Sequence, residues 1–547
     1  MAPSPTSSVV SEVWSSLPSS VTSKSWVSYL LFLSVFSFVL YIIGSEITRY
    51  SARVPNLPGP RGLPLVGSLP WLRGKVHAEQ YRLWSHKYGD VFQVQLGERT
   101  AVVVNSAAAA RELFLGQREA TKSRPLFYVL HGKVQGGSPV TSIGTSPWND
   151  SCKNRRKVGA TAMNRVSVDS YQPIINSESR SFLSDLLAAS LSSTSRTVDF
   201  RDPVRKYAMN LVLTLNYGTR VEDVKQLRGE TIFAEMVRVE SEISRLRNTS
   251  GNNENYIPLL RPIKAIATRL GFGDANYMAD IGRRRVGYHK ILLENLRAEV
   301  AAGTDKPCIQ GNVLKDPESK NLSEGELLSV SLSMMAGADT SQPTVAWAVL
   351  LLSQRQDIQQ KAFKAIVQAD SSLLGEADVS YSKVEYVDAF TKEVGRFYTA
   401  LKLGLPRATS DDVGATWNGA TIPPKTLLFL NAWACSKDPK IFPNPDDFTP
   451  ERWLQPGTTH LHQFAFGMGS RMCIANHLAH KALYTAFLHL IAHFEILPAA
   501  EAAEDPHVLD PVEGLLHKES FVATPRNCTV RLVPRDIERT KRVLSVK

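Results

Sequence analysis

The pattern of apolar and polar residues contains one long uncharged run close to the N-terminus. Residues 26–45 carry no charged side chain. About twenty helical residues span roughly 30 Å, the thickness of the hydrocarbon core of a bilayer. Trp26, Tyr29 and Tyr41 lie toward the ends of this run, where aromatic side chains are frequent in membrane spans. The pattern therefore predicts a single transmembrane anchor at residues 26–45.

The charges that flank the anchor predict its orientation. Lys24 precedes the uncharged run, whereas Arg49, Arg53 and Arg61 follow it. Basic residues are retained predominantly on the cytoplasmic side of a membrane. We therefore expect residues 1–25 to form a lumenal tail and the bulk of the chain to lie in the cytosol.

A basic, proline-rich hinge is predicted at residues 46–70. Pro55, Pro58, Pro60 and Pro64 are too closely spaced for a helix and favour a semi-rigid extended connector. No change in composition divides the chain after this segment. Residues 71–547 are therefore expected to form one large catalytic domain.

The pattern beyond residue 70 is mainly helical with a small amount of strand. Residues 90–97 and 99–105 are typical of two β-strands joined by a short turn. Ser323 and Glu326 form a capping box at the start of a long apolar helix. Apolar residues also repeat at helical spacing between Ala475 and Leu490. These features predict a mostly α domain with small β-sheets.

Composition and charge exclude several classes of protein. The five cysteines are widely spaced and odd in number, so they indicate neither a disulfide framework nor a structural zinc site. A net charge of +11 is spread over 547 residues, and the short basic runs lack interleaved aromatic residues. We therefore expect no nucleic-acid binding. A basic docking face for an acidic protein partner stays open.

Cys473 has the surroundings of a metal ligand. It lies just before the helix predicted from Ala475 onward, where free amide groups and the helix dipole favour a thiolate. Gly467 and Gly469 would let the backbone turn its amides toward the sulfur. Arg471 could hold an anionic group beside it. The alternative is a buried structural cysteine, which is the commoner role of a single cysteine.

The segment around Cys473 resembles the heme-binding loop of the cytochrome P450 family, the heme-thiolate monooxygenases. The matching positions are Phe466, Gly469, Arg471, Cys473 and Ala475. The resemblance implies that heme b is the cofactor and that the Cys473 thiolate is the axial ligand of its iron. It also implies that Phe466, Gly469 and Arg471 belong to the heme-binding site.

The long apolar helix carries an acid beside a hydroxyl group. Its residues 336–341 resemble the signature of the helix that crosses the oxygen side of the heme in this family. The resemblance implies that Asp339 and Thr340 are catalytic and relay protons to O2, and that Gly337 leaves room for the oxygen. The alternative is an exposed polar face. Pro343 lacks an N–H, so we expect the helix to open or kink near Asp339.

Further residues are expected at the edge of the heme. In the family, a tryptophan and an arginine four residues later bind a heme propionate. Here Cys152 stands four residues after Trp148, and Arg155 follows about one turn later. We expect Trp148 and Arg155 to reach the heme edge, with Arg156 as the competing residue. Arg407 resembles the arginine that reaches a propionate.

A structural network is expected behind the heme loop. Glu393 and Arg396 lie on one face of a predicted helix, and Arg452 follows in the family's usual order. The resemblance implies that Glu393, Arg396 and Arg452 form a network that supports the loop. The alternative is an ordinary exposed salt bridge.

Segments at 144–148, 207–218 and 303–308 are similar to those of the fungal phenylacetate 2-hydroxylase group, whereas residues 401–404 depart from it. The family resemblance implies insertion of one atom of O2 into a small aromatic or aromatic-containing metabolite. NADPH would supply electrons through NADPH–cytochrome P450 reductase, with cytochrome b5 as a second candidate partner. We expect a single-pass protein of the endoplasmic reticulum membrane, acting in fungal secondary metabolite biosynthesis.

Three other functions compete with this expectation. One is a phenylacetate-type ring hydroxylase of aromatic catabolism. The second is a heme-thiolate isomerase or dehydratase that needs no reductase, against which the pair of Asp339 and Thr340 argues. The third is a noncatalytic heme sensor, which would need neither that pair nor a membrane anchor shared with a reductase.

Overall fold

Helices form about 58% of the structure and the strands form small sheets, as the sequence predicts. The computed structural model describes residues 19–546, except residues 139, 249–250, 275, 318–321, 382 and 459–460. The first helices are α2 (Ser19–Ser51), α3 (Leu69–Leu72), α4 (His77–Tyr88), α5 (Ala107–Arg111), α6 (Asp150–Ala162), α7 (Arg165–Ser170), α8 (Gln172–Ser192), α9 (Arg201–Tyr217) and α10 (Ile232–Arg247). They are followed by α11 (Leu260–Arg269), α12 (Tyr277–Ala302), α13 (Ile309–Lys315), α14 (Glu324–Gln354), α15 (Gln356–Ala369), α16 (Glu385–Tyr398), α17 (Ala432–Ser436), α18 (Asn476–His493), α19 (Ala500–Glu504) and α20 (Ile537–Ser545).

The strands build three sheets within the described residues. The first has the order β1-β2-β7-β4, the second β3-β9-β8 and the third β5-β6. The strands are β1 (Val91–Leu96), β2 (Arg99–Val104), β3 (Thr197–Asp199), β4 (Arg407–Ala408), β5 (Ala415–Trp417), β6 (Ala420–Ile422), β7 (Leu427–Leu430), β8 (Phe494–Pro498) and β9 (Thr529–Pro534). β1 and β2 pair antiparallel, with Val91 opposite Val104, which confirms the two predicted strands. β7 adds parallel to β2, so residues distant in sequence close this sheet.

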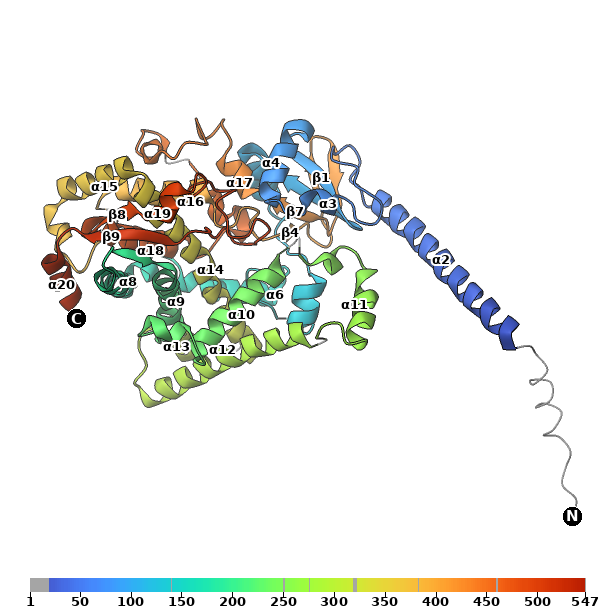
Figure 1. Ribbon diagram of the computed structural model, residues 1–547, viewed down its shortest axis with the longest axis horizontal. Coiled ribbons are helices and arrows are strands. Elements are labelled where there is room, and N and C mark those ends of the chain that lie inside the picture. The colour runs from blue at the N-terminus through green and yellow to red at the C-terminus, as the bar shows by residue number, and fades with distance from the viewer. Residues whose placement is uncertain are drawn as a thin grey trace, which may run out of the picture.

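Helix α2 contains the predicted anchor. Its residues Trp26–Ser51 have a mean hydropathy of 2.2, and none of the apolar window is buried. Figure 1 shows α2 projecting as one rod from the rest of the molecule. This helix is therefore long and apolar enough to cross a membrane. Most of the tail predicted at residues 1–25 lies outside the described residues.

The proline-rich segment lies against the first sheet. α2 continues to Ser51, so the predicted hinge at 46–70 is helical in its first part. Val54 and Leu57 are buried. The Gln93 side chain on β1 accepts from the Val54 N–H at 2.9 Å and donates to its carbonyl at 2.8 Å. The segment is thus held to the domain by packing and by hydrogen bonds between its backbone and the Gln93 side chain.

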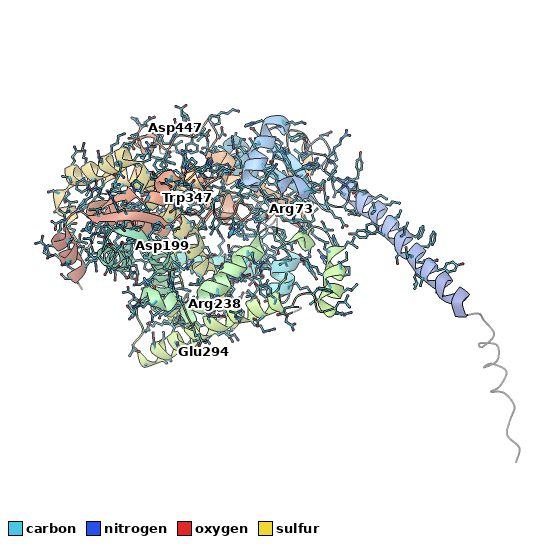
Figure 2. The ribbon with its side chains drawn as sticks, viewed as in Figure 1. Arg73, Asp199, Arg238, Glu294, Trp347 and Asp447 are labelled. Atoms are coloured by element: carbon cyan, nitrogen blue, oxygen red, sulfur yellow. The ribbon has the colours of Figure 1, made fainter. Side chains whose placement is uncertain are left out.

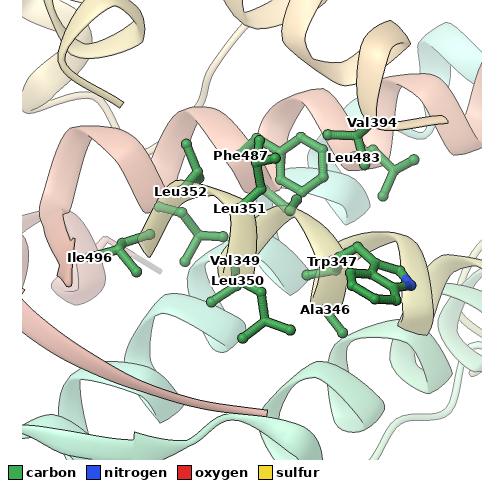
Figure 3. Close-up of a cluster of buried hydrophobic side chains, with 14 of the residues drawn as sticks. Ala346, Trp347, Val349, Leu350, Leu351, Leu352, Val394, Leu483, Phe487 and Ile496 are labelled. Carbon is green, nitrogen blue, oxygen red and sulfur yellow. The ribbon is translucent and has the colours of Figure 1, made fainter. Parts of the chain in front are cut away.

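Helix α14 runs through the core. The predicted capping box is confirmed, because Ser323 and Glu326 bond reciprocally at its start. Residues 345–352 are all buried, and Figure 3 shows Leu351 and Trp347 among Val394 of α16 and Leu483 and Phe487 of α18. The charged residues labelled in Figure 2 are exposed, whereas Trp347 is buried.

Pro343 does not interrupt this helix. α14 is helical from Glu324 to Gln354 with Pro343 inside it, so the predicted opening is absent from these residues. The Thr344 hydroxyl donates to the Thr340 carbonyl at 2.7 Å. Loss of one N–H removes one backbone hydrogen bond, and the tightly packed turns that follow hold the helix together.

Candidate active site

The loop before α18 is closed by its own backbone. The N–H of Cys473 donates to the carbonyl of Phe466 at 2.8 Å. Gly469 has a φ of 64°, and a Cβ atom there would lie 2.1 Å from the Phe114 carbonyl oxygen. Only glycine permits that approach and that conformation. Phe466 and Gly469 therefore shape the turn that presents Cys473.

Cys473 is exposed, whereas the other four cysteines are buried. Its neighbours Ile474 and Ala475 pack against a hydrophobic cluster that includes Met334 of α14. Burial raises the pKa of the Cys473 thiol, and the Ala475 N–H and the charge of Arg156 oppose that rise. A deeply placed thiol with accessible surface faces an internal space.

The pKa of Cys473 differs from the sequence prediction. The position before a helix favours a thiolate, but desolvation outweighs the nearby dipoles in the folded protein. A metal cation deprotonates a coordinating thiol directly. Cys473 therefore suits a metal ligand, although its surroundings alone do not ionise it.

Four arginines gather beside this loop without carboxylate partners. Arg124, Arg407 and Arg471 are buried and Arg156 is half-buried. Arg407 donates to the Met468 carbonyl, and the other three also donate to backbone carbonyls. None of the four forms an ion pair within the described residues, although burying an uncompensated cation is costly.

The positive charges of this cluster lower the pKa values of neighbouring arginines. Burial and the charges of Arg471 and Arg156 lower the pKa of Arg407 to about 9. Burial and the other three arginines lower the pKa of Arg124. Arg124 Nε and Arg407 Nη1 are buried and have no hydrogen-bond acceptor among the described residues. The cluster is therefore complementary to a ligand with several negative charges.

Heme b fits these residues. Its two propionates are carboxylates, which guanidinium groups bind with charge-assisted hydrogen bonds. Cys473 would supply a sulfur for the iron, and the buried donors of Arg124 and Arg407, which have no acceptor in the described part of the chain, would supply hydrogen bonds to the propionates. The chemistry of the site thus agrees with the ligand that the loop resemblance implies.

Trp148 borders the arginine cluster. The guanidinium carbon of Arg471 lies 5.5 Å from the centroid of the Trp148 ring. Arg471 also donates to the Ser146 carbonyl at 2.6 Å and to the Cys152 sulfur at 3.3 Å. Trp148 stands before α6, which begins at Asp150. Cys152, found where the family has an arginine, is thus a partner of Arg471.

Arg155 does not join the cluster. It is fully buried, and it donates to the Ser329 and Ser146 hydroxyls and to the carbonyls of Thr141 and Ser151. Each nitrogen of its guanidinium group therefore donates a hydrogen bond to another group of the protein. Successive residues on a helix point about 100° apart, so Arg156 points in another direction than Arg155. Arg156 donates to the Met472 carbonyl at 2.9 Å. The competing residue of the sequence prediction is therefore better placed than Arg155.

The acid–hydroxyl pair lies in the half-exposed middle of α14. Residues 336–342 are half-buried, whereas residues 334–335 and 345–352 are buried. Asp339 Oδ2 lies 3.6 Å from Nη1 of Arg247, the last residue of α10. Burial and the charge of Glu240 raise the pKa of Asp339 to about 7. Asp339 can therefore hold or release a proton near neutral pH.

Thr340 and Gly337 are neighbours on the same turn. Thr340 Oγ1 donates to the Gly337 carbonyl at 3.2 Å. A Cβ atom on Gly337 would lie 3.3 Å from Cγ1 of Val212 on α9. The missing side chain thus lets α14 and α9 approach closely. The sequence predicted that Gly337 leaves room for oxygen, and it did not predict this packing role.

The network of Glu393, Arg396 and Arg452 is present. Arg396 donates to both Glu393 oxygens at 2.7 and 2.8 Å, and Arg452 Nε donates at 3.1 Å. The Trp453 indole and the Thr449 N–H also donate to Glu393. The Glu393 carboxylate, with no exposed surface, is therefore fully hydrogen-bonded and ties α16 to the segment that precedes the loop.

Sequence reasoning missed Arg124 and Arg247. Arg124 precedes Pro125 in an otherwise ordinary loop, and Arg247 ends a helix rich in surface charge. Neither position carries a local pattern that distinguishes it from a solvated arginine. Only the fold brings Arg124 to Arg407 and Arg247 to Asp339.

Comparison with known proteins gives concordant matches. The family model described as Cytochrome P450 matches residues 57–523. The 3-hydroxyphenylacetate 6-hydroxylase of Emericella nidulans is 42% identical, over 93% of this chain and 95% of that protein. The phenylacetate 2-hydroxylase of the same organism is 38% identical, over 92% and 94%. A cytochrome P450 monooxygenase of Mycosarcoma maydis is 37% identical, over 88% and 87%.

Proposed function

Because the chain belongs to the cytochrome P450 family, we propose that this heme monooxygenase is membrane-anchored and hydroxylates a small aromatic acid. The observation that carries the proposal is the exposed Cys473 beside four arginines that have no carboxylate partner in the part of the chain that the structure describes. Bound heme supplies the iron at which O2 is activated with NADPH-derived electrons. One oxygen atom enters the substrate and the other leaves as water, which consumes two electrons and two protons.

The residues of this chain have distinct roles in the proposed reaction. The Cys473 sulfur would hold the iron, and Arg124, Arg407 and Arg471 would bind the propionates, because Arg124 and Arg407 have donors without acceptors among the described residues. Asp339 holds a proton on its carboxyl group near neutral pH, because burial raises its pKa to about 7. The Thr340 hydroxyl, one residue further along α14, can pass a proton from solvent or from Asp339 toward the reacting oxygen.

The relatives support an aromatic substrate. Those that are 42% and 38% identical are named for hydroxylation of 3-hydroxyphenylacetate and phenylacetate. We therefore favour a phenylacetate-type ring hydroxylase over an enzyme of secondary metabolite biosynthesis, which was the first expectation from the sequence. Trp148 and Arg156 complete the proposed heme edge, and Arg155 is replaced there by Arg156.

The membrane and the redox partner belong to the same proposal. The apolar helix over residues Trp26–Ser51 would anchor the protein in the endoplasmic reticulum membrane, with the catalytic domain in the cytosol. NADPH–cytochrome P450 reductase in the same membrane would deliver electrons, and cytochrome b5 is a second candidate donor.

Turnover of the purified full-length enzyme with the reductase tests this function. We expect reductase-dependent NADPH consumption and an arylacetic acid product heavier by one oxygen atom, measured by mass spectrometry with isotopically labelled O2. An isomerase would convert substrate without reductase, and a sensor would form no product. Cys473→Ala should abolish turnover and the thiolate-ligated spectrum of the ferrous carbon monoxide complex. Full turnover by Cys473→Ala would refute the proposal.

A further inference from the structure

A pocket beside the arginine cluster has aromatic walls and cationic lining residues. It encloses about 450 Å³ between its lining atoms, including its opening. Phe127, Phe521 and Leu246 are among its apolar residues, and its charged lining residues are Arg124 and Arg247. No carboxylate lines this pocket within the described residues. Such a lining is complementary to an aromatic anion.

Arg247 lines this pocket with a hydrogen-bond donor that has no acceptor among the described residues. Its side chain is 8% exposed, and its one ion pair among the described residues is the 3.6 Å contact with Asp339. That distance is longer than the donor–acceptor distance of a hydrogen bond. Arg247 Nε is buried and has no acceptor among the described residues. A buried guanidinium with an orphaned donor is therefore poised for a further acceptor.

Arg247 belongs to a different charge group from the heme-edge arginines. The charges that perturb it are those of Arg285, Asp339 and Glu240. Those that perturb Arg124 are Arg471, Arg407 and Arg156. The two cations of the pocket thus belong to separate charge groups, and only Arg124 belongs to the group assigned to the propionates.

The nearest carboxylates do not neutralise Arg247. Glu240 is occupied by Arg285, which donates to both of its oxygens at 2.7 and 2.9 Å, and by the Tyr288 hydroxyl. This pairing lowers the pKa of Glu240 to about 2, so it stays ionised together with Arg285. Asp339 is protonated in part near neutral pH. Arg247 is therefore only partly neutralised near neutral pH.

We propose that Arg247 is a specificity-determining residue, which binds the carboxylate of an arylacetate-type substrate and directs its ring into the pocket. The inference rests on the proposed function and adds the group that selects an acid over a neutral aromatic compound. Phe127 and Phe521 supply apolar contacts for the ring, and the guanidinium fork of Arg247 matches a carboxylate.

The position of Asp339 makes this binding depend on pH. The groups that face Arg247 are Glu240 on α10, Arg285 and Tyr288 on α12, Asp339 on α14 and His131, whose pKa is lowered by burial and by Arg247. Of these, Asp339 changes charge near neutral pH. When ionised, Asp339 competes with the substrate for Arg247, so carboxylate affinity falls as pH rises through about 7. A bound carboxylate in turn favours protonated Asp339.

Binding titrations of the full-length holoenzyme test the inference. Phenylacetate and neutral phenylacetamide are titrated into the wild type, Arg247→Gln and Arg247→Lys, and binding is read from the heme absorption spectrum. Since a charge-assisted hydrogen bond contributes about 1.5–3 kcal/mol, Arg247→Gln should weaken phenylacetate binding about 10- to 100-fold. Phenylacetamide affinity should stay within about threefold, and Arg247→Lys should restore part of the phenylacetate affinity.

A matched control lies on the same helix. Arg245 is 64% exposed and pairs with Glu242 at 2.7 Å, so Arg245→Gln should leave both affinities unchanged. Phenylacetate affinity of the wild type should fall from about pH 6 to about pH 8, and Asp339→Asn should remove that dependence.

Several results would overturn the inference. Equal loss of both ligands in Arg247→Gln with a normal heme spectrum would assign Arg247 a packing role, and unchanged phenylacetate affinity would exclude the contact. Oxidation of neutral aromatics without phenylacetate binding would remove the inference and the acid substrate, but would leave the heme monooxygenase activity of the proposed function intact. A wild type without the thiolate-ligated carbon monoxide spectrum would instead refute the proposed function itself.

Discussion

Replacing Asp339 by asparagine should stabilise the protein at alkaline pH. Burial raises the pKa of Asp339 from its usual 3.8 to about 7, so the folded protein binds a proton that the unfolded chain releases between these values. Stability therefore falls as pH rises through this window, by about 1.4 kcal/mol for each pH unit. The full window corresponds to about 4 kcal/mol, which Asp339→Asn should recover above pH 7.

The assay is urea denaturation of the heme-loaded wild type and Asp339→Asn, followed by tryptophan fluorescence at about pH 5 and about pH 8. The difference in free energy of unfolding between the two proteins should grow with pH in favour of asparagine. Asp378→Asn is the matched control, because Asp378 is 67% exposed and pairs with Arg180 at the surface. A difference that stays constant with pH, or that favours aspartate at pH 8, would refute the raised pKa of Asp339.

Three further predictions concern the rest of the site. Glu393→Gln should destabilise the protein by about 3–5 kcal/mol, because it leaves two buried arginines without their carboxylate; a thermal unfolding midpoint equal to that of the wild type would contradict the network. Arg407→Gln should accelerate heme loss, measured by transfer of heme to apomyoglobin, and an unchanged rate would exclude a propionate contact. Thr340→Ala should consume NADPH with less product and more peroxide, and unchanged coupling would count against its role in proton transfer.

The sequence predicted the elements that depend on local pattern. The capping box at Ser323, the paired strands β1 and β2, and the long apolar helix α2 all follow from residues close together in the chain. The loop of Cys473 could be recognised because its glycines and arginine occur at fixed spacing. Features that depend only on residues close together in the chain can be predicted without knowledge of the fold.

The surroundings that the sequence did not predict depend on direction and distance in the folded chain. Arg155 and Arg156 are adjacent in sequence, and the choice between them depends on the rotation of α6 about its axis. Gly337 faces Val212 because α14 and α9 pack closely. The pKa of Cys473 rises because desolvation, which no sequence pattern reveals, outweighs the helix dipole.

Two groups of buried arginines in this chain show how binding residues differ from structural ones. Arg396 and Arg452 are enclosed by the Glu393 carboxylate and by backbone carbonyls, so their charges are compensated inside the protein. Arg407 is equally buried, yet it has an unused donor and a pKa lowered by other cations. Burying cations together opposes folding unless an anion joins them. Arg155 is also buried without a carboxylate, but hydroxyl and carbonyl groups accept from its guanidinium. Buried arginines that lack a carboxylate and also keep a donor without an acceptor among the described residues therefore mark the positions where ligands supply the charge.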